Sequence, residues 1–180
     1  PSFLVSYLAM SIINRKKYFL DLYINGEKIK RYKAVFGRNN GFIKNNQNDF
    51  ITPHGTYRIC SIEKEHNNHI FIKINYPNKE DALEAFKNSI ISKSEMKEII
   101  QADTSGNLPA ASTKLGSGIG IHGIGYFNSV FKNMPFIFNW TNGSAAIKNE
   151  DIDELVSIVE IGDTVIINKN WIYRWNYSKY

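Results

Sequence analysis

The chain has 180 residues, of which 43% are hydrophobic and 22% charged, a composition that indicates one globular domain and excludes a disordered chain. Its 22 basic and 17 acidic residues give a net charge of +5, which suits a polyanionic partner. Nucleic acid is not the expected partner, because no run of Lys and Arg is interleaved with aromatic residues. No apolar run is long enough to span a bilayer, so no transmembrane segment is expected.

The N-terminal part of the chain predicts strands. Residues 18–24 and 27–36 form a predicted hairpin around Asn25-Gly26, because both turn residues tolerate positive φ. An Asn- and Gly-rich loop precedes a predicted strand that contains Cys60. Because Cys60 is the only cysteine, it cannot form an internal disulfide, and we expect a buried structural residue.

A further strand is predicted over residues 69–75, where three isoleucines alternate and share one face. The segment 66–69 before it resembles a hairpin turn, and its two histidines have no third ligand nearby in the sequence. No metal site is therefore expected. The proline at position 77 ends the strand, since it has no amide hydrogen to donate.

Two helices are predicted next. Asn78 is a suitable N-cap for a helix in which Leu83, Phe86 and Ile90 follow helical spacing. The apolar residues between 96 and 100 repeat that spacing in a second short helix.

The C-terminal part predicts two short strands, one helix and a closing strand. Residues 116–123 form a glycine-dense strand whose backbone another group must approach closely, and residues 144–147 form the second strand. Asn149 is the expected N-cap of a helix whose apolar residues recur at helical spacing between 152 and 159. Residues 164–167 form the closing strand.

These elements predict a mostly β (α+β) fold with about three short helices. We expect one domain over residues 11–167, with 1–10 as an N-terminal extension or first strand. Residues 168–180 form an aromatic C-terminal strand or extension, in which 171–177 place four aromatic side chains on one face. Such a face more often packs on the domain, or on an additional domain, than stacks on sugar rings.

His122 and Ser144 are the candidate chemical groups. Acyl transfer needs a nucleophile, a base, a group that orients the base, and donors for the oxyanion. Gly143 permits a sharp turn, so the amides of Gly143, Ser144 and Ala145 can converge on one oxygen. The carbonyl of Gly123 is the nearest partner for the second ring nitrogen of His122. Taken alone, these residues also fit a structural histidine and an ordinary Gly-Ser turn.

The order of these motifs resembles the L,D-transpeptidase (YkuD-type) catalytic domain. That family has a histidine, a short gap, and then Ser/Thr-His/Asp-Gly-Cys followed by an apolar residue. Thr141 and Gly143 match this pattern, and Ser144 occupies the cysteine position. Residues 52–59 are similar to the family's Thr-Pro-x-Gly-x-Tyr signature, and the resemblance spans about residues 11–167. The fold that it implies is an L,D-transpeptidase-like β-sandwich or barrel.

The resemblance also implies a site and a branch of the family. Asn142 stands where many members have a second histidine. Together with Tyr76-Pro77-Asn78, this resembles the branch that contains the cell-shape L,D-carboxypeptidases and the lipoprotein-detaching enzymes. The nucleophile would be the residue at 144, with His122 as the base and Gly123 as its orienting carbonyl. The implied oxyanion donors are Gly143, Ser144 and Ala145. The implied substrate contacts are Tyr76, Asn78, Gly120, Thr141 and Asn142.

The implied reaction is acyl transfer at the L,D peptide bond of peptidoglycan stem tetrapeptides, by transpeptidation or carboxypeptidation. No metal or organic cofactor is implied. The implied location is the bacterial cell envelope, periplasmic or secreted. The chain begins at Pro1 without a signal peptide, which either a cleaved leader or a trimmed sequence explains.

Ser144 departs from the family pattern, because a hydroxyl is far less acidic than a thiol and depends wholly on an aligned base. We expect it to be an engineered replacement of the cysteine that inactivates the enzyme. The alternative is a natural pseudoenzyme that acts as a peptidoglycan-binding module. A working serine hydrolase ranks third.

Overall fold

The computed structural model describes residues 7–41, 43–126 and 136–168. Within these ranges the chain forms eight strands and three helices, so the expectation of a mostly β fold with about three short helices is confirmed. The strands form a single sheet in the order β3-β2-β1-β8-β4-β5-β6-β7.

One half of the sheet comes from the two ends of the described chain. β1 (Ala9–Asn14), β2 (Phe19–Ile24) and β3 (Glu27–Lys33) are antiparallel neighbours, and β8 (Thr164–Asn168) lies parallel to β1. The β2–β3 turn has φ values of 51° and 83° at its Asn and Gly, as the Asn-Gly pair predicts. The first strand begins at Ala9, inside the stretch expected to be an extension or first strand.

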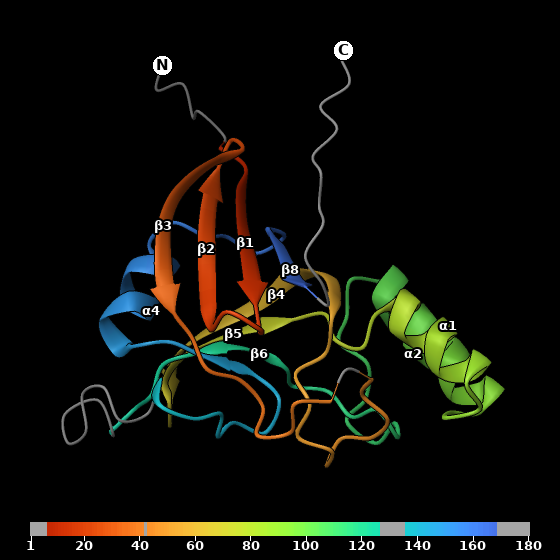
Figure 1. Cartoon of the computed structure of the whole chain (residues 1–180). Helices are drawn as coiled ribbons and strands as arrows, with labels where there is room; N and C mark the ends of the chain where they lie inside the picture. The colour runs from red at the N-terminus through yellow and green to blue at the C-terminus, as the bar shows by residue number, and fades with distance from the viewer. Residues whose placement is uncertain (1–6, 42, 127–135, 169–180) are drawn as a thin grey trace, which may run out of the picture.

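The long strand β4 (Gly55–His66) joins this half to the other. Its beginning pairs with β8, and its remainder pairs with β5 (His69–Ile74). β5 then pairs with β6 (Gly120–His122), and β6 lies parallel to β7 (Ala145–Ala146). Figure 1 shows the β1–β3 half standing across the direction of β5 and β6, so the sheet turns at β4.

The main core lies against β5 and the helix α4 (Asn149–Val156). The three alternating isoleucines of β5 are buried there together with Ile152 and Leu155 of α4, which have no exposed surface. Each fully buried side chain of this size contributes about 1.5–3 kcal/mol to folding. Because alternate residues of a strand face opposite ways, Phe71 and Lys73 are left for the other face of β5.

The helices α1 (Lys79–Lys87) and α2 (Lys93–Thr104) form a pair to one side of the sheet (Figure 1). Asn78 caps α1 as expected, in a capping box with Asp81. The buried face of α1 is not the expected apolar spacing, however. Ala82 and Ala85 face the small core between the helices, whereas Leu83 and Phe86 are 44% and 41% exposed.

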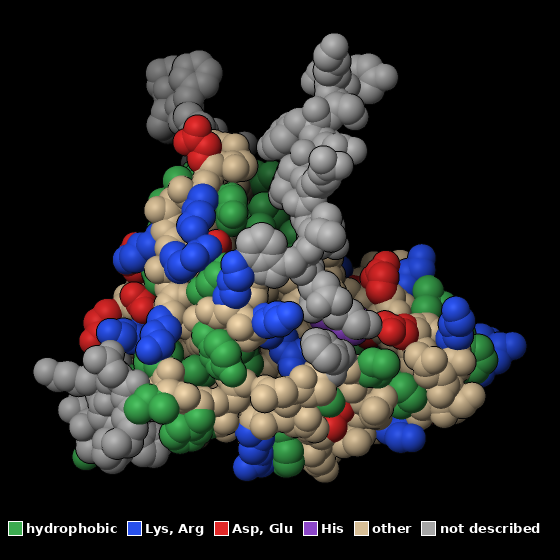
Figure 2. All heavy atoms as spheres, viewed as in Figure 1, with side chains coloured by type: hydrophobic (Ala, Val, Ile, Leu, Met, Phe, Trp, Pro, Cys, Tyr) green, Lys and Arg blue, Asp and Glu red, His purple; other side chains and the backbone are tan. Residues whose placement is uncertain are grey.

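Lys and Arg side chains gather over the β2–β3 face, as Figure 2 shows. Lys28 and Arg31 both pair with Asp21, the arginine through two hydrogen bonds, and Lys30 pairs with Glu154. Carboxylates of the same molecule therefore neutralise much of this basic face. Asp21 is buried, with its side chain 6% exposed, whereas Lys30 and Glu154 are each 41% exposed. Only the Lys30–Glu154 pair is therefore of the exposed kind that contributes little to stability.

Two other expectations meet the structure here. Cys60 is half-buried rather than buried, and partial burial raises the pKa of its thiol. The aromatic segment 171–177 lies outside the described residues. Among the residues that are described, no helix combines the length and the apolarity needed to cross a membrane.

Candidate active site

The pairing of β6 with β7 brings His122 and Ser144 to the same hollow. Ile121 pairs with Ala145, so Ser144 lies beside Gly120 and on the strand face that His122 shares. The amide of Gly120 donates a hydrogen bond to Oγ of Ser144 at 3.2 Å. We call this space the histidine hollow, because His66 and His122 line it together with Phe71, Lys73, Trp140 and Ser144.

His122 is held as a neutral imidazole with one free acceptor. Its Nδ1 lies 2.6 Å from the carbonyl oxygen of Gly123, and because a carbonyl only accepts, Nδ1 carries the hydrogen. Nε2 is then the acceptor. The ring is only 3% exposed and contacts Phe71 and Trp140, each at a centroid distance of 5.8 Å. Burial lowers the pKa of His122 to about 4, and the Gly123 bond opposes this shift only in part.

The segment that follows His122 is anchored by Asn149. The Asn149 Oδ1 accepts from the amides of Ile124 and Gly125, at 2.9 and 3.0 Å. The expectation that Asn149 caps α4 is therefore wrong: the N-cap is Lys148, without a side-chain bond, and the Asn149 side chain stabilises the histidine segment instead. A Cβ at Gly123 would lie 2.6 Å from that Oδ1, which explains the glycine.

Thr141 holds the turn that presents Ser144. Its hydroxyl donates to the carbonyl oxygen of Ser144 at 2.6 Å and accepts from the amide of Gly143 at 3.2 Å. Gly143 has φ +130°, and a Cβ there would lie 2.9 Å from Cδ1 of Ile119. This turn therefore needs both the glycine and the buried threonine.

The oxyanion role of Gly143, Ser144 and Ala145 stays a prediction. The amide of Gly143 donates to Thr141, so it would have to leave that bond to serve a substrate oxygen. By contrast, the amide of Gly120 already points at Oγ of Ser144.

Ser144 also lines a second hollow. We call it the amide hollow, because Gln47, Asn48 and Asn142 line it together with Lys44 and Phe50. Asn142, Gly118 and Ser144 border both hollows. Position 144 is thus accessible from both hollows. Of the expected contacts, Asn142 borders both hollows and Thr141 lines only the histidine hollow.

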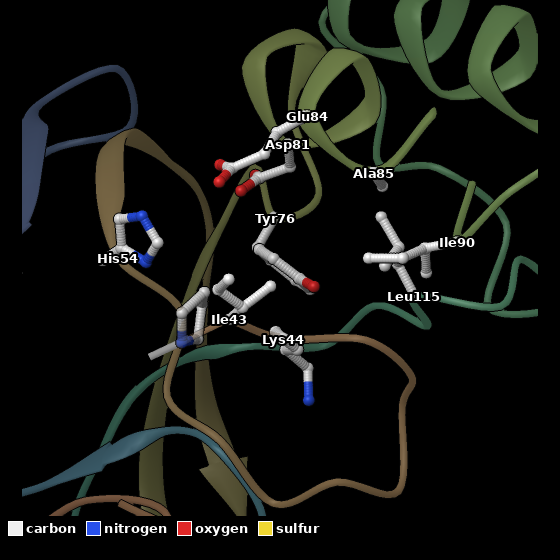
Figure 3. Close-up of a pocket in the computed structure, with 10 residues that line it drawn as sticks. Ile43, Lys44, His54, Tyr76, Asp81, Glu84, Ala85, Ile90 and Leu115 are labelled. Carbon is white, nitrogen blue, oxygen red and sulfur yellow. The ribbon is translucent and has the colours of Figure 1, made fainter. Parts of the chain in front are cut away.

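Tyr76 and Asn78 lie elsewhere. Tyr76 is 1% exposed and lines a pocket next to α1, where Figure 3 shows Asp81 and Glu84 on the side of its ring opposite Lys44. Asn78 is committed to the cap of α1, and its amide also donates to the carbonyl of Thr56 at 3.0 Å. Neither residue lines the histidine hollow or the amide hollow, and their role in substrate binding stays a prediction.

Asp81 is a buried ionisable residue that lines the same pocket. One carboxylate oxygen accepts from the amide of Asn78 at 2.9 Å, and the other accepts from the Tyr57 hydroxyl at 3.1 Å. Burial raises the pKa of Asp81 to about 7, and Glu84 and Glu80 add to the shift, while the two hydrogen bonds oppose it.

The sequence reasoning missed the wall of the histidine hollow formed by β4 and β5. Glu63, His66, Phe71 and Lys73 all line it. A signal was present, because the alternation that buries three isoleucines of β5 turns Phe71 and Lys73 to the opposite face. In the described ranges, no group of three or more His, Cys, Asp or Glu could hold a metal, and His69 pairs with Asp153 at 2.8 Å.

Comparison with protein families identifies the catalytic domain family. Residues 9–167 match the family described as YkuD, L,D-transpeptidase catalytic domain. No curated protein matches the chain in sequence.

Solved structures share the fold. The helical cell shape determining protein Pgp2 from Campylobacter jejuni is 16% identical with a TM-score of 0.56, and the match covers 93% of this chain and 50% of that one. Bd1075 from Bdellovibrio bacteriovorus is 19% identical with a TM-score of 0.53, covering 93% and 50%. An L,D-transpeptidase from Mycobacterium smegmatis is 10% identical with a TM-score of 0.54, covering 91% and 59%. The chain thus spans between half and three-fifths of the length of these proteins.

Proposed function

We propose, from the premise that this chain belongs to the YkuD family of L,D-transpeptidase catalytic domains, that it is built for acyl transfer on peptidoglycan stem tetrapeptides. The observation that carries the proposal is the shared hollow of His122 and Ser144, with the imidazole tautomer fixed by Gly123. The bond attacked would be the L,D peptide bond that precedes the terminal D-Ala. The location that follows is the bacterial cell envelope.

The proposed reaction has two halves. The nucleophile at 144 attacks the carbonyl carbon at the L-centre while Nε2 of His122 takes its proton. The tetrahedral intermediate then collapses, and the imidazolium returns that proton to the leaving amine of D-Ala, which leaves an acyl-enzyme. In the second half an amine or water attacks the acyl group, and His122 again takes and returns the proton.

The low pKa of His122 favours a thiol over a hydroxyl at position 144. An imidazole with a pKa of about 4 is neutral at pH 7 and ready to accept a proton, but it is a weak base. A thiol ionises near pH 8.5, whereas a serine hydroxyl is much less acidic, so the mismatch between donor and base is far larger for Ser144. The site is therefore better matched to the cysteine of the family than to Ser144.

Replacing Ser144 tests the proposal. Ser144→Cys should release D-Ala steadily from a purified stem tetrapeptide, as measured by mass spectrometry, whereas the Ser144 form should show little or no turnover. The matched control is Ser144→Ala, which removes only the hydroxyl and with it the nucleophile. Unchanged tetrapeptide after prolonged incubation with Ser144→Cys would count against the proposal.

A second candidate is a binding module that holds wall peptides without turnover, and Ser144 itself is the observation that favours it. In that case the unaltered chain should sediment with insoluble sacculi, and His122→Ala should leave this retention unchanged. Loss of retention on His122→Ala would speak against simple binding.

Access from two sides bears on the choice between transpeptidase and carboxypeptidase. With the acyl donor in the histidine hollow, the amide hollow leaves a path by which a second stem could reach the acyl group. We propose that this path serves an amine acceptor. Ser144→Cys should then yield cross-linked dimers in addition to tripeptides, and tripeptides alone would favour the carboxypeptidase.

A further inference from the structure

The peptide unit between Gly123 and Ile124 is hydrogen-bonded at both of its ends. Its carbonyl oxygen accepts from Nδ1 of His122 at 2.6 Å, and its amide donates to Oδ1 of Asn149 at 2.9 Å. Because a peptide unit is planar and rigid, holding the N–H end also fixes the direction of the C=O end. The side chain of Asn149 is therefore linked to the imidazole of His122 through one rigid group.

The partners of Asn149 fix which way its side-chain amide points. Oδ1 faces the N–H groups of Ile124 and Gly125, whereas Nδ2 donates to the carbonyl oxygen of Gly125 at 3.0 Å. A flipped amide would set its NH₂ against two donors and its oxygen against an acceptor. Because Gly123 and Ile124 are both buried, removal of Oδ1 would leave a buried N–H without its acceptor.

The same short stretch of chain carries position 144 and Asn149. After Ser144 and β7, the amide of Ile147 donates to the carbonyl oxygen of His122 at 3.0 Å, and Asn149 then opens α4. The backbone that presents the nucleophile therefore also places the side chain that is bonded to the partner of the base.

The helix α4 begins without a side-chain cap. Asn is among the strongest N-cap residues, yet the N-cap is Lys148, which makes no side-chain bond to the helix. A lysine is also unfavourable at the positive end of the helix dipole. A departure from local preference of this kind is expected where a side chain serves a functional site.

We propose that Asn149 is a positioning residue for the base. It orients the carbonyl of Gly123, and that carbonyl keeps the hydrogen of His122 on Nδ1, so that Nε2 remains the acceptor. Asn149 lines neither the histidine hollow nor the amide hollow, and it acts only through this peptide unit. This inference rests on the proposed function, since it adds a residue to the same site.

The hydrogen on the ring of His122 tests the inference without any turnover. Long-range ¹H–¹⁵N spectra of the labelled chain distinguish the two tautomers. We expect the Nδ1–H form in the unaltered chain and a mixture of both forms in Asn149→Ala, because the Gly123 carbonyl is then free to turn. Asn149→Asp keeps an oxygen that accepts from both amides, so it should keep the Nδ1–H form. If Asn149→Ala does not fold, Asn149→Gln displaces the oxygen by one methylene and should give the same mixture.

The rate of D-Ala release in a Ser144→Cys background gives the second readout. Asn149→Ala should lower kcat about tenfold and leave KM within about twofold, because the base is misaligned but no substrate contact is lost. Asn149→Asp should restore most of kcat. The matched control is Asn75→Ala, which likewise removes an oxygen that accepts from a backbone amide, that of Arg58 at 2.8 Å, away from both hollows. This control should leave kcat within about twofold.

The outcomes separate the inference from the proposed function. An unchanged Nδ1–H form in Asn149→Ala, or equal losses of kcat in Asn149→Ala and Asn75→Ala, would overturn the inference alone. Absence of turnover in the Ser144→Cys chain itself would instead count against the proposed function, and the spectra of His122 would still decide the role of Asn149.

Discussion

The histidine hollow and the pocket at Tyr76 each contain a buried ionisable group whose pKa is shifted, and the two shifts have opposite directions. Burial lowers the pKa of His122 to about 4 and raises that of Asp81 to about 7. In both cases desolvation disfavours the charged form, so His122 loses its proton and Asp81 retains one. Both groups are therefore poised to be neutral, although they are of opposite type.

The difference between the two regions lies in what surrounds the neutral group. Asp81 has both oxygens bonded, to the amide of Asn78 and the hydroxyl of Tyr57, and it stabilises the start of α1. His122 has only Nδ1 bonded, and its ring lines an open hollow together with Ser144. A perturbed pKa alone does not identify an active site. The histidine hollow is distinguished by an unused acceptor and by access for a substrate.

The largest effect should come from removing the imidazole where a nucleophile is present. In a Ser144→Cys background, His122→Ala should lower the rate of D-Ala release by about 100-fold or more, because the proton acceptor is lost. Tyr57→Phe in the same background removes the hydroxyl that bonds Asp81 and the carbonyl of His54, away from the histidine hollow, and should leave the rate within about twofold. Comparable losses for both variants would remove the functional distinction between the two regions.

The pH dependence of unfolding should separate the two groups. Because the pKa of His122 is lower in the folded state, the stability that its neutral form contributes is fully present above pH 6.5. This stability is lost as the pH falls towards about 4. Because the pKa of Asp81 is higher in the folded state, the stability that its neutral form contributes is fully present below pH 3.8. This stability is lost as the pH rises through about 7. Each slope is at most about 1.4 kcal/mol per pH unit, and the two oppose each other.

Single variants should therefore reveal one slope each in denaturant unfolding between pH 4 and pH 7. Asp81→Asn should make stability rise more steeply with pH, whereas His122→Gln should make it fall more steeply. Parallel profiles for both variants and the unaltered chain would show that burial does not control these two pKa values.

The turn at Ser144 should be sensitive to the loss of one hydroxyl. Thr141→Val leaves the amide of Gly143 and the carbonyl of Ser144 without their buried partner, at a cost of about 1–3 kcal/mol in unfolding free energy. Thr141→Ser keeps the hydroxyl and should retain most of the stability. If the valine and serine variants unfold at the same denaturant concentration, the hydroxyl does not hold the turn.

The smallest effect is expected at the cap of α1. Asn78→Ala removes the side-chain acceptor of the capping box and should cost about 1 kcal/mol, while Asn78→Asp should be nearly neutral. Stability is measured by thermal unfolding, and stem-peptide affinity is measured in parallel. A drop in affinity for Asn78→Ala without a drop in stability would favour the substrate contact predicted from the sequence.

Local patterns predicted much of the fold, and the missed features arise from distant contacts. The Asn25-Gly26 pair correctly predicted a hairpin, and the alternating isoleucines correctly predicted the buried face of β5. Both predictions succeed because turn and strand preferences are local. Leu83 and Phe86 followed helical spacing, yet α1 buries its alanines, since only tertiary packing decides which face is covered. Asn149 looked like a cap, but its side chain stabilises a segment 24–25 residues away in the chain.

The candidate site also combines features that local sequence predicts with features that depend on distant contacts. The bond between His122 and the carbonyl of the next residue is local and was foreseen, and it is present at 2.6 Å. The wall of Glu63, His66 and Lys73 depends on the register of three strands, which no local pattern specifies.

The most direct test of the account is the alkylation rate of a thiol introduced by Ser144→Cys, followed at pH 7 by iodoacetamide and peptide mass spectrometry. Cys60 serves as an internal reference, because partial burial raises the pKa of its thiol. The account predicts that the thiol at position 144 reacts faster than Cys60, and that adding His122→Ala slows only the former. Equal rates at position 144 with and without the imidazole would contradict it.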